Sequence, residues 1–452
     1  MSKTKTVFYC SSCGHESPKW EGKCPACNAW NTYREEKIVT SKTQIAARQN
    51  SPVPRQLNEI VASGQDRWPT ADSELARILG GGIVPGSLIL VGGNPGIGKS
   101  TLMLQEALSN PAKVLYVSGE ESLEQLKLRA SRLGLNGEHT YFITDTDLDA
   151  VLDAAKTLQP AIMIIDSIQT LYLPNLESTP GSFIQIRETT GELLRFSKKT
   201  HTAVFIIGHI TKEGQIAGPK LLEHMVDVVL QFEGDGHLQY RIVRTHKNRF
   251  GSADEIGIYE MRSDGLKPVT NPSELLISQT DESYSGSAIG AVIEGQRPLL
   301  VETQALVSTA IYGTPQRSAT GFDLRRLSML LAVLEKRCGY FFGQKDVFLN
   351  MAGGLRIEDP AIDLAVCAAL ISSQEDLPIP PKMGFAAEIG LTGEVRAVGR
   401  IEQRIAEAER LGFNSIIISH FNLRHLKKKA FKITIYDIER IQGLAEIING
   451  QG

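Results

Sequence analysis

The 452-residue chain has no apolar run near the roughly 20 residues that cross a bilayer, which excludes an ordinary transmembrane helix. Its amino terminus, MSKTKTVFYC, lacks the apolar stretch of a secretory signal peptide. It also lacks a strong charge imbalance, because the formal net charge is only −3. The chain as a whole therefore has no general attraction to nucleic acid, which local basic clusters would have to supply. We expect a cytoplasmic protein that makes no membrane contact.

A chain of this length, with 42% hydrophobic and 22% charged residues, is typical of a soluble protein of about three globular domains. Shifts in composition and the positions of the motifs divide it further. We expect a metal-binding ribbon over residues 1–33, a polar linker over 34–56, a nucleotide-binding domain over 57–270 and another domain over 271–452.

Cysteine is scarce except near the amino terminus, where four of the six cysteines fall within the first 27 residues. They form two C-x-x-C turns, and four thiolates from two such turns can surround one zinc ion tetrahedrally. A segment this short needs a metal or a covalent cross-link to fold, and two disulfides would require an oxidising compartment that nothing else in the chain indicates. The pattern favours a structural zinc site with the ligands Cys10, Cys13, Cys24 and Cys27.

Glycines gather in the stretch 88–101, LILVGGNPGIGKST, where an apolar run leads into the nucleotide-binding pattern G-x-x-x-x-G-K-[ST]. They let backbone N–H groups point at phosphate oxygens, and the start of the following helix adds its positive dipole end. We expect Lys99 to reach the β- and γ-phosphates of ATP and the Ser100 hydroxyl to ligate magnesium. The expected nucleotide contacts are Gly93, Asn94, Pro95, Gly96, Ile97, Gly98, Lys99, Ser100 and Thr101.

Two further apolar runs lead into acidic residues. Residues 161–165 are typical of a buried parallel strand, and they end at Asp166, which can hold the magnesium shell through water. Residues 114–117 precede Glu120 and Glu121. Because ligands sit at the carboxyl ends of strands in open α/β sheets, we expect one of these glutamates to polarise the attacking water. The alternative for Glu121 is that it only caps the helix that follows.

Apolar strands and amphipathic helices alternate from residue 57 to about residue 268, which is typical of a parallel sheet built from βαβ units. Residues 226–233 and 237–246 have the pattern of two strands joined by Gly-Asp-Gly, and we expect them to form an antiparallel hairpin at the edge of the sheet. A parallel core with such a hairpin favours a RecA-like ATPase over one of the adenylate-kinase type.

Two cations come directly after that hairpin. We expect Lys247 and Arg249 on one side of an extended strand, with Gly251 letting the chain turn away. Their spacing suits joint presentation to a γ-phosphate across a subunit boundary, as in an arginine finger. It suits equally well a solvated edge strand whose charges discourage pairing with other strands.

Several motifs occur in an order that resembles the bacterial RadA (Sms) recombination family over nearly the whole chain. They are the four-cysteine ribbon, GGNPGIGKST, VSGEES, IIDSIQT, GHITKEGQIAGPKLLEHMVD and KNRFG. The resemblance implies a RecA-like, DNA-dependent ATPase that acts on single-stranded and branched DNA, drives branch migration as a hexameric ring and works with a RecA-type recombinase. It also implies that Lys99, Ser100 and Asp166 bind the nucleotide, and that KNRFG, residues 247–251, is needed for action on DNA.

From about residue 271 the pattern is α+β and resembles the proteolytic domain of Lon. Lon-type hydrolysis requires a serine nucleophile and a lysine base. Ala361 and Ile401 stand at the two corresponding positions of this sequence, and neither can do that chemistry. We therefore expect a RecA-like α/β core with an N-terminal zinc ribbon and a C-terminal, α+β, Lon-protease-like domain. We interpret that last domain as a catalytically inactive scaffold for ring assembly and DNA contact.

Basic residues leave two interpretations open in that domain, since such clusters usually mark solvated helix faces but can also form a rim that binds DNA phosphates. The loop 212–220, with two lysines, is a better candidate for a DNA channel. His209, just before it, could sense the γ-phosphate or make an ordinary structural hydrogen bond. The basic clusters consist of Arg325, Arg326, Lys336 and Arg337, and of Arg424, Lys427, Lys428 and Lys429.

Three functions therefore compete. The first is an ATP-driven DNA motor, the second an ATP-dependent protease, and the third a regulatory ATPase of the circadian-clock type, which shares the paired glutamates. The missing catalytic dyad argues against the protease. The zinc ribbon and KNRFG argue against the regulatory ATPase.

Overall fold

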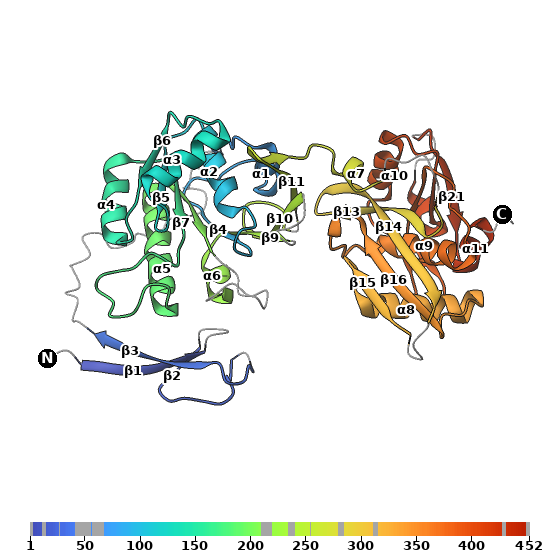
Figure 1. The fold of residues 1–452 in the computed structure, drawn as a ribbon, viewed down its shortest axis with the longest axis horizontal. Helices are drawn as coiled ribbons and strands as arrows, with labels where there is room; N and C mark the ends of the chain where they lie inside the picture. Colours follow the sequence, from blue (N-terminus) through green and yellow to red (C-terminus); the bar gives the residue numbers. More distant parts are fainter. Residues whose placement is uncertain are drawn as a thin grey trace. The chain divides into compact units, whose positions relative to one another are not determined.

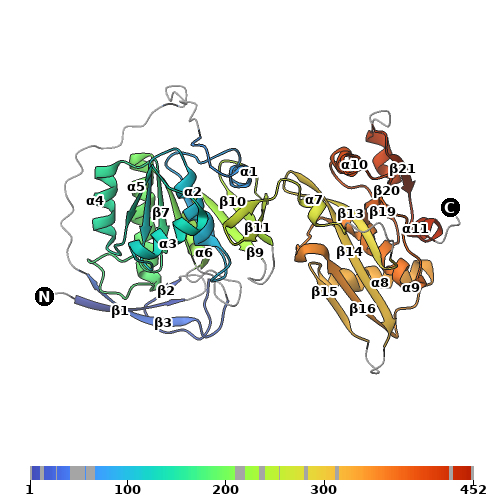
Figure 2. The same cartoon turned by 45° about the horizontal axis from the view of Figure 1, so that its top comes forward.

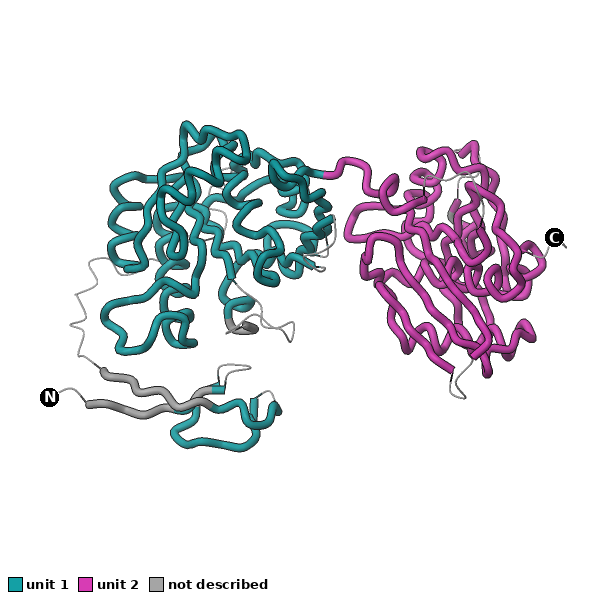
Figure 3. Tube along the Cα trace, in the orientation of Figure 1, with its two compact units in different colours: residues 1–268 teal, residues 269–452 magenta. Residues whose placement is uncertain are grey.

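A computed structural model describes residues 3–10, 15–26, 28–40, 56, 67–208, 219–233, 240–253, 255–278, 284–310, 315–426 and 431–448. The chain divides into two compact units, residues 1–268 and 269–452 (Figure 3). Within the described ranges, every helix is too short or too polar to span a bilayer.

The amino-terminal segment contains a three-stranded antiparallel sheet in the order β2-β1-β3. Its strands are β1 (Lys3–Cys10), β2 (Glu16–Ser17) and β3 (Tyr33–Thr40). Strand β3 pairs with β1 along its whole length, so regular structure continues to Thr40, inside the segment that the sequence predicts as a linker.

A mixed nine-stranded sheet organises the rest of the first unit, in the order β12-β11-β10-β9-β4-β8-β7-β5-β6 (Figures 1 and 2). The strands from β9 to β6 in this order are parallel to one another. Strand β8 separates β4, which leads into the phosphate loop, from β7, which ends at Asp166. The parallel strands are β4 (Leu88–Gly92), β5 (Val114–Ser118), β6 (Thr140–Ile143), β7 (Ile162–Asp166), β8 (Ala203–Ile207) and β9 (Val228–Glu233).

Helices cover both faces of this sheet. One face carries α1 (Ser73–Ile78), α2 (Lys99–Ser109) and α3 (Leu123–Leu133), and the other carries α4 (Leu148–Leu158), α5 (Phe183–Thr200) and α6 (Pro219–Met225). Successive strand residues point to opposite faces. On β4, Ile89 and Val91 pack with α1 to α3, whereas Leu88 and Leu90 pack with α4 to α6. Burial on both faces explains why the strands are continuously apolar.

The antiparallel pairing of β9 with β10 (Tyr240–Asn248) is confirmed, but its predicted place at the edge of the sheet is wrong. Strand β9 also pairs with β4, and β10 is covered in turn by β11 (Ile256–Arg262) and β12 (Gly265–Pro268). The buried Tyr259 of β11 packs into the same core cluster as residues of α1 and α2, so the sheet extends past the hairpin.

The second unit is an α+β domain around a seven-stranded sheet in the order β15-β16-β14-β13-β17-β20-β21. Helix α9 (Asp363–Glu375) packs on β13 and β14, and α10 (Ile401–Arg410) packs on their other face. Helices α8 (Leu324–Cys338) and α11 (Ile441–Ile448) contact α9, and α7 (Pro272–Leu275) contacts β14. The strands are β13 (Ser287–Glu294), β14 (Arg297–Thr309), β15 (Arg317–Thr320), β16 (Lys345–Met351), β17 (Met383–Ala386), β20 (Ser415–Ser419) and β21 (Thr434–Ile438), with the separate pair β18 (Glu388–Ile389) and β19 (Val395–Arg396).

Candidate active site

The phosphate loop lies between β4 and α2 and depends on glycine at two crowded positions. Gly93 and Gly98 have φ angles of 150° and 119°, in the region that side chains rarely adopt. A Cβ atom on Gly93 would lie 2.8 Å from the Cβ of Phe232, and one on Gly98 would lie 3.1 Å from the Cε of Met261. The loop therefore curls tightly under the added strands β9 and β11, with residues 94–96 exposed at its tip.

Lys99 begins α2 and folds back across this loop. Its Nζ donates to the carbonyl oxygens of Gly93 at 2.8 Å and Asn94 at 2.9 Å, and the residue is only 3% exposed. Burial lowers the pKa of Lys99 to about 8, while the nearby charges of Asp166 and Glu120 act in the opposite direction. A cation is thus held at the mouth of a ring of backbone groups, as phosphate binding requires.

Ser100 and Asp166 meet although they are far apart in sequence. The Ser100 hydroxyl donates to Oδ1 of Asp166 at 3.1 Å, and the Tyr116 hydroxyl donates to Oδ2 at 2.7 Å. Burial raises the pKa of Asp166, and both hydrogen bonds oppose that effect. A hydroxyl and a carboxylate oxygen at one point match the hard oxygen ligands that Mg²⁺ prefers, so the donor set fits this ion. Sequence reasoning missed Tyr116, although a buried strand tyrosine must find a partner for its hydroxyl.

The paired glutamates have different surroundings. Both carboxylate oxygens of Glu121 accept from Nη1 of Arg129, at 2.6 and 2.7 Å. The Oε1 atom of Glu120 accepts from the Ser167 hydroxyl at 2.8 Å. Helix α3 is capped by Ser122, through a reciprocal hydrogen-bond pair with Gln125, and not by Glu121. The glutamate that lies toward Lys99 and Asp166 is therefore Glu120.

The sequence predicts Lys247 and Arg249 on one side of the same strand, and this prediction is wrong. Strand β10 ends at Asn248, and its register with β9 shifts between Thr245 and Lys247, so Arg249 lies in the turn that follows. The Nζ atom of Lys247 donates to the carbonyl oxygens of Glu223 at 2.7 Å and Val226 at 2.8 Å, at the carboxyl end of α6.

Arg249 projects outward, with 59% of its side chain exposed. Its Nη1 atom lies 3.8 Å from Oδ1 of Asp227, and its backbone N–H donates to the Asp227 carbonyl oxygen. The buried Asp227 carboxylate also accepts from Lys198 at 2.7 Å and from the backbone of Leu88 at 3.0 Å. Arg249 is thus anchored at the end of the sheet where β4 begins.

That end of the sheet is opposite the phosphate loop of the same chain. Arg241, near the start of β10, donates from Nε to the carbonyl oxygen of Ile97 at 3.0 Å, so this end of the strand touches the loop. Lys247 is six residues further along, which at about 3.3 Å per residue places it roughly 20 Å away. Neither Lys247 nor Arg249 can reach the phosphate loop of the same chain. Arg241 is a second residue that sequence reasoning missed.

The predicted zinc ligands are only partly within the described residues. Cys10 and Cys24 are buried in one small cluster with Tyr33, whose hydroxyl lies 3.8 Å from the Cys24 Sγ. The Cys10 Sγ lies 3.1 Å from the Thr32 hydroxyl. Hydroxyl groups aimed at sulfur suit thiolates held by a metal, so this half of the site fits zinc. Cys13 and Cys27 lie outside the described residues.

Some of the predicted DNA contacts lie within the described residues, and others do not. His209, residues 212–218 and Lys427, Lys428 and Lys429 lie outside the described residues, as does the side chain of Lys220. Arg326 does not belong to a solvated face, because it forms an ion pair with the buried Asp363 of α9. Arg325, Lys336 and Arg337 are exposed.

The position of a Lon-type dyad is apolar. Ala361 and Ile401 are both buried in the cluster that α10 forms with β13 and β20, and neither side chain can act as a nucleophile or a base. Close by, Arg404 forms an ion pair of 2.5 Å with Asp359, and its Nη1 also donates to the carbonyl oxygen of Ala291 at 2.8 Å. Together these contacts tie α10 to the sheet.

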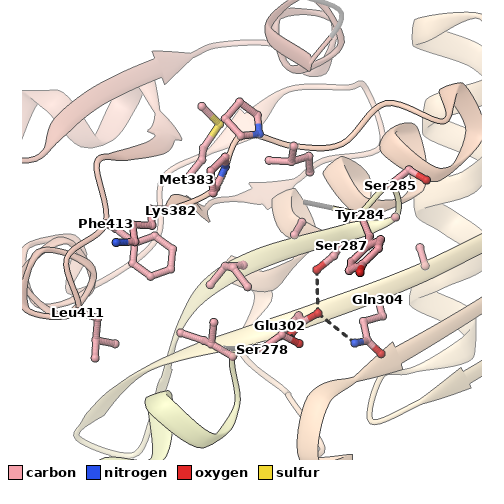
Figure 4. Close-up of a pocket in the computed structure, with 18 of the residues that line it drawn as sticks. Ser278, Tyr284, Ser285, Ser287, Glu302, Gln304, Lys382, Met383, Leu411 and Phe413 are labelled. Atoms are coloured by element: carbon pink, nitrogen blue, oxygen red, sulfur yellow. Dashed lines mark hydrogen bonds between the residues drawn. The ribbon is translucent and has the colours of Figure 1, made fainter. Parts of the chain in front are cut away.

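A cavity of about 590 Å³ opens elsewhere in the second unit (Figure 4). Its polar floor is Glu302, whose carboxylate accepts from Ser278, Ser287 and Gln304. Burial alone would raise the pKa of Glu302, but these hydrogen bonds outweigh it and hold the pKa below its ordinary value. The Glu302 carboxylate is therefore held in its charged form by its three partners. Its apolar wall includes Ile379, Met383, Leu411 and Phe413.

Comparison with known families matches three parts of the chain. Residues 8–35 match a family described as "Rubredoxin metal binding domain", residues 62–215 one described as "AAA domain", and residues 301–422 one described as "Subunit ChlI of Mg-chelatase". Among solved structures, the RadB recombinase is 25% identical, with 44% of this chain and 97% of that chain covered and a TM-score of 0.36. A KaiC-like protein from Pyrococcus horikoshii is 18% identical, with 45% and 99% covered and a TM-score of 0.39.

Whole-chain relatives are more similar. The DNA repair protein RadA of Bacillus subtilis is 49% identical over 431 residues, which cover 94% of each chain. The DNA repair protein RadA of Listeria monocytogenes is also 49% identical, over 93% of this chain and 94% of its own. The predicted fold class, a RecA-like α/β core with an amino-terminal zinc ribbon and a carboxyl-terminal α+β domain, is confirmed. Similarity at this level over nearly the full length places the chain in the RadA family of DNA repair proteins.

Proposed function

We propose that this chain is a DNA-dependent ATPase that promotes branch migration of recombination intermediates as a ring of identical subunits, together with a RecA-type recombinase. Membership of the RadA family and the AAA-domain match support the coarser part, an ATPase of DNA repair. The observation that carries the finer part is the placement of Arg249, exposed and anchored at the end of the sheet opposite its own phosphate loop.

At the nucleotide, the backbone of residues 93–98 surrounds the phosphates and Lys99 moves from its loop carbonyls to the β- and γ-phosphate oxygens. Ser100 and Asp166 would hold Mg²⁺, which would neutralise phosphate charge when bound. Glu120 accepts the proton of the attacking water as its oxygen bonds to the γ-phosphorus and the bond to the bridging oxygen breaks. Glu121, held by Arg129, supports α3 instead.

Arg249 supplies positive charge to the γ-phosphate of a neighbouring subunit, because an arginine finger in trans needs a cation that projects outward from a fixed mount. Lys247 donates hydrogen bonds to the carboxyl end of α6, the helix that begins within the last residues of the predicted DNA loop 212–220. Through this contact, ATP hydrolysis at a junction between two subunits is linked to the segment that contacts the DNA strand. The ribbon carries a structural zinc ion on Cys10, Cys13, Cys24 and Cys27.

Mixing two inactive variants tests the action of Arg249 in trans. Lys99→Ala subunits lack a working phosphate loop but keep the finger, and Arg249→Ala subunits have the reverse defect. In random mixed rings about a quarter of the junctions combine an intact loop with an intact finger, so ATP hydrolysis should return to about a quarter of the wild-type rate. A control mixture of Lys99→Ala with the double variant should stay inactive. Absence of recovery in the first mixture would contradict the proposed junction.

A further inference from the structure

Two acidic motifs interlock at the carboxyl ends of the neighbouring strands β5 and β7. Ser118 and Asp166 are register partners, and beyond them the backbone N–H of Gly119 donates to the Asp166 carbonyl oxygen at 2.8 Å. One residue further on each strand, the Ser167 hydroxyl donates to Oε1 of Glu120 at 2.8 Å. The side chain that follows the magnesium-site aspartate thus holds the glutamate that follows the other strand.

Ser167 is itself fixed from several sides. It is fully buried, and its carbonyl oxygen accepts from the hydroxyl of Thr170 at 2.8 Å. The next residue, Ile168, donates its backbone N–H to the Ile207 carbonyl oxygen of β8 at 3.0 Å. The Ser167 hydroxyl therefore starts from a backbone that is tied to β8 and closed by a turn.

Gly119 completes this mount because no side chain would fit there. A Cβ atom at Gly119 would lie 1.9 Å from the hydroxyl oxygen of Thr170 and 2.6 Å from its Cβ. Both are closer than real contacts permit, so Thr170 can pack over the end of β5 only when residue 119 is glycine. The two motifs fit together as one rigid unit around an exposed glutamate.

A glutamate on an exposed loop samples many rotamers, and a general base acts efficiently only when it is held in hydrogen-bond reach of its proton. Glu121 gains its orientation from Arg129, which also removes it from the reaction. Glu120 accepts a hydrogen bond from the Ser167 hydroxyl, which fixes the direction of its carboxylate.

We propose that Ser167 is a positioning residue for ATP hydrolysis, which orients the carboxylate of Glu120 toward the attacking water. This inference rests on the proposed role of Glu120 as the base. Ser167 itself touches neither the nucleotide nor the reacting atoms in this account, so its loss should lower kcat while nucleotide affinity stays unchanged.

The test compares Ser167→Ala with Ser118→Ala in the full chain. Both remove a buried serine hydroxyl at the ends of adjacent strands, but the Ser118 hydroxyl accepts from the backbone of Glu121 at 3.0 Å. A hydrogen bond to a charged group contributes more free energy than one between neutral groups, so Ser167→Ala should lower kcat roughly tenfold to a hundredfold. The Kd for a fluorescent ATP analogue should stay unchanged within about twofold. Ser118→Ala should keep kcat within about threefold. Ser167→Cys, with a weaker donor of similar size, should lie between.

A double-mutant cycle separates positioning from general damage. Single-turnover hydrolysis is measured for Glu120→Gln and for Glu120→Gln combined with Ser167→Ala. If Ser167 acts through Glu120, the second change should alter the rate by less than about twofold in this background. Three results would each overturn the positioning role. They are a loss of hydrolysis rate in the Glu120→Gln background as large as in the wild type, a wild-type kcat in Ser167→Ala alone, and weakened binding of the ATP analogue.

The same series distinguishes failure of this inference from failure of the proposed function. If Glu120→Gln hydrolyses ATP at the wild-type rate, the base is misassigned and both statements about Glu120 fall. If Glu120→Gln is slow while Ser167→Ala is normal, only the role of Ser167 falls. Every rate is measured both with and without single-stranded DNA. The two outcomes can therefore be told apart in either condition.

Discussion

Glu106, on the helix that follows the phosphate loop, makes the stability of the ATPase domain depend on pH. The residue is 2% exposed, and its carboxylate accepts from Asn110 at 2.7 Å and from the backbone of Ala71 at 3.1 Å. Burial raises the pKa of Glu106 from 4.5 to about 7, although both hydrogen bonds oppose the rise. The folded state therefore holds the proton of Glu106 more tightly than the unfolded state does.

The direction and size of the effect follow from that difference. Stabilisation by the proton is fully present below about pH 4.5 and is lost as the pH rises through about 7. At about 1.4 kcal/mol per pKa unit, the whole range is worth about 3 kcal/mol in the free energy of unfolding. Between about pH 5.5 and pH 8.5 the loss should be about 2 kcal/mol.

Replacing Glu106 by glutamine removes the titration, so the assay is the difference in unfolding free energy between wild type and Glu106→Gln at the two pH values. Donors that face the new amide impose a constant cost, which cancels when the two pH values are subtracted. Urea unfolding can be followed by tryptophan fluorescence after Trp20 and Trp30 are replaced by phenylalanine in every variant, which leaves Trp68 as the reporter; the neighbouring Pro69 carbonyl oxygen accepts from Asn110. The same change at the exposed Glu138 is the control. A Glu106→Gln variant with the same pH slope as wild type would show that Glu106 does not cause this pH dependence.

Three further predictions concern other parts of the chain. Arg404→Met leaves the buried Asp359 carboxylate without its ion pair and should lower the free energy of unfolding of the second unit by about 3–5 kcal/mol, partly restored by adding Asp359→Asn; an unchanged melting temperature would contradict this. Cys24→Ser should lose zinc, which metal analysis of the purified chain would disprove by finding one ion per chain. Lys247→Ala should bind nucleotide normally but lose branch migration, so normal migration of a labelled junction would remove its proposed role.

Local patterns in the sequence were sufficient for the nucleotide loop and for most strands. The apolar run before Gly93 and the glycines after it form the expected strand and loop, because both depend on residues close together in the chain. The start of α3 was equally local, although Ser122 caps it through Gln125. The place of the hairpin in the sheet could not be predicted from nearby residues, because it depends on the pairing of β11 with the outer side of β10.

The partners inside the site could not be predicted for the same reason. Tyr116 meets Asp166, and Ser167 meets Glu120, only because β5 and β7 are neighbours in the sheet. Likewise Arg326 has the spacing of an exposed helix face, but α9 brings Asp363 against it. The order of strands and the packing of helices decide such contacts, and a single sequence carries no direct signal of either.

In the proposed function, ATP hydrolysis between subunits moves a DNA strand. The most direct measurement is the steady-state rate of ATP hydrolysis by the purified full chain, with and without single-stranded DNA, under conditions where its oligomeric state is measured in parallel. We expect an oligomer whose hydrolysis rate rises when DNA is added, and no rise in the Lys99→Ala or Arg249→Ala variants. A monomer that hydrolyses ATP at the same rate with and without DNA would contradict it.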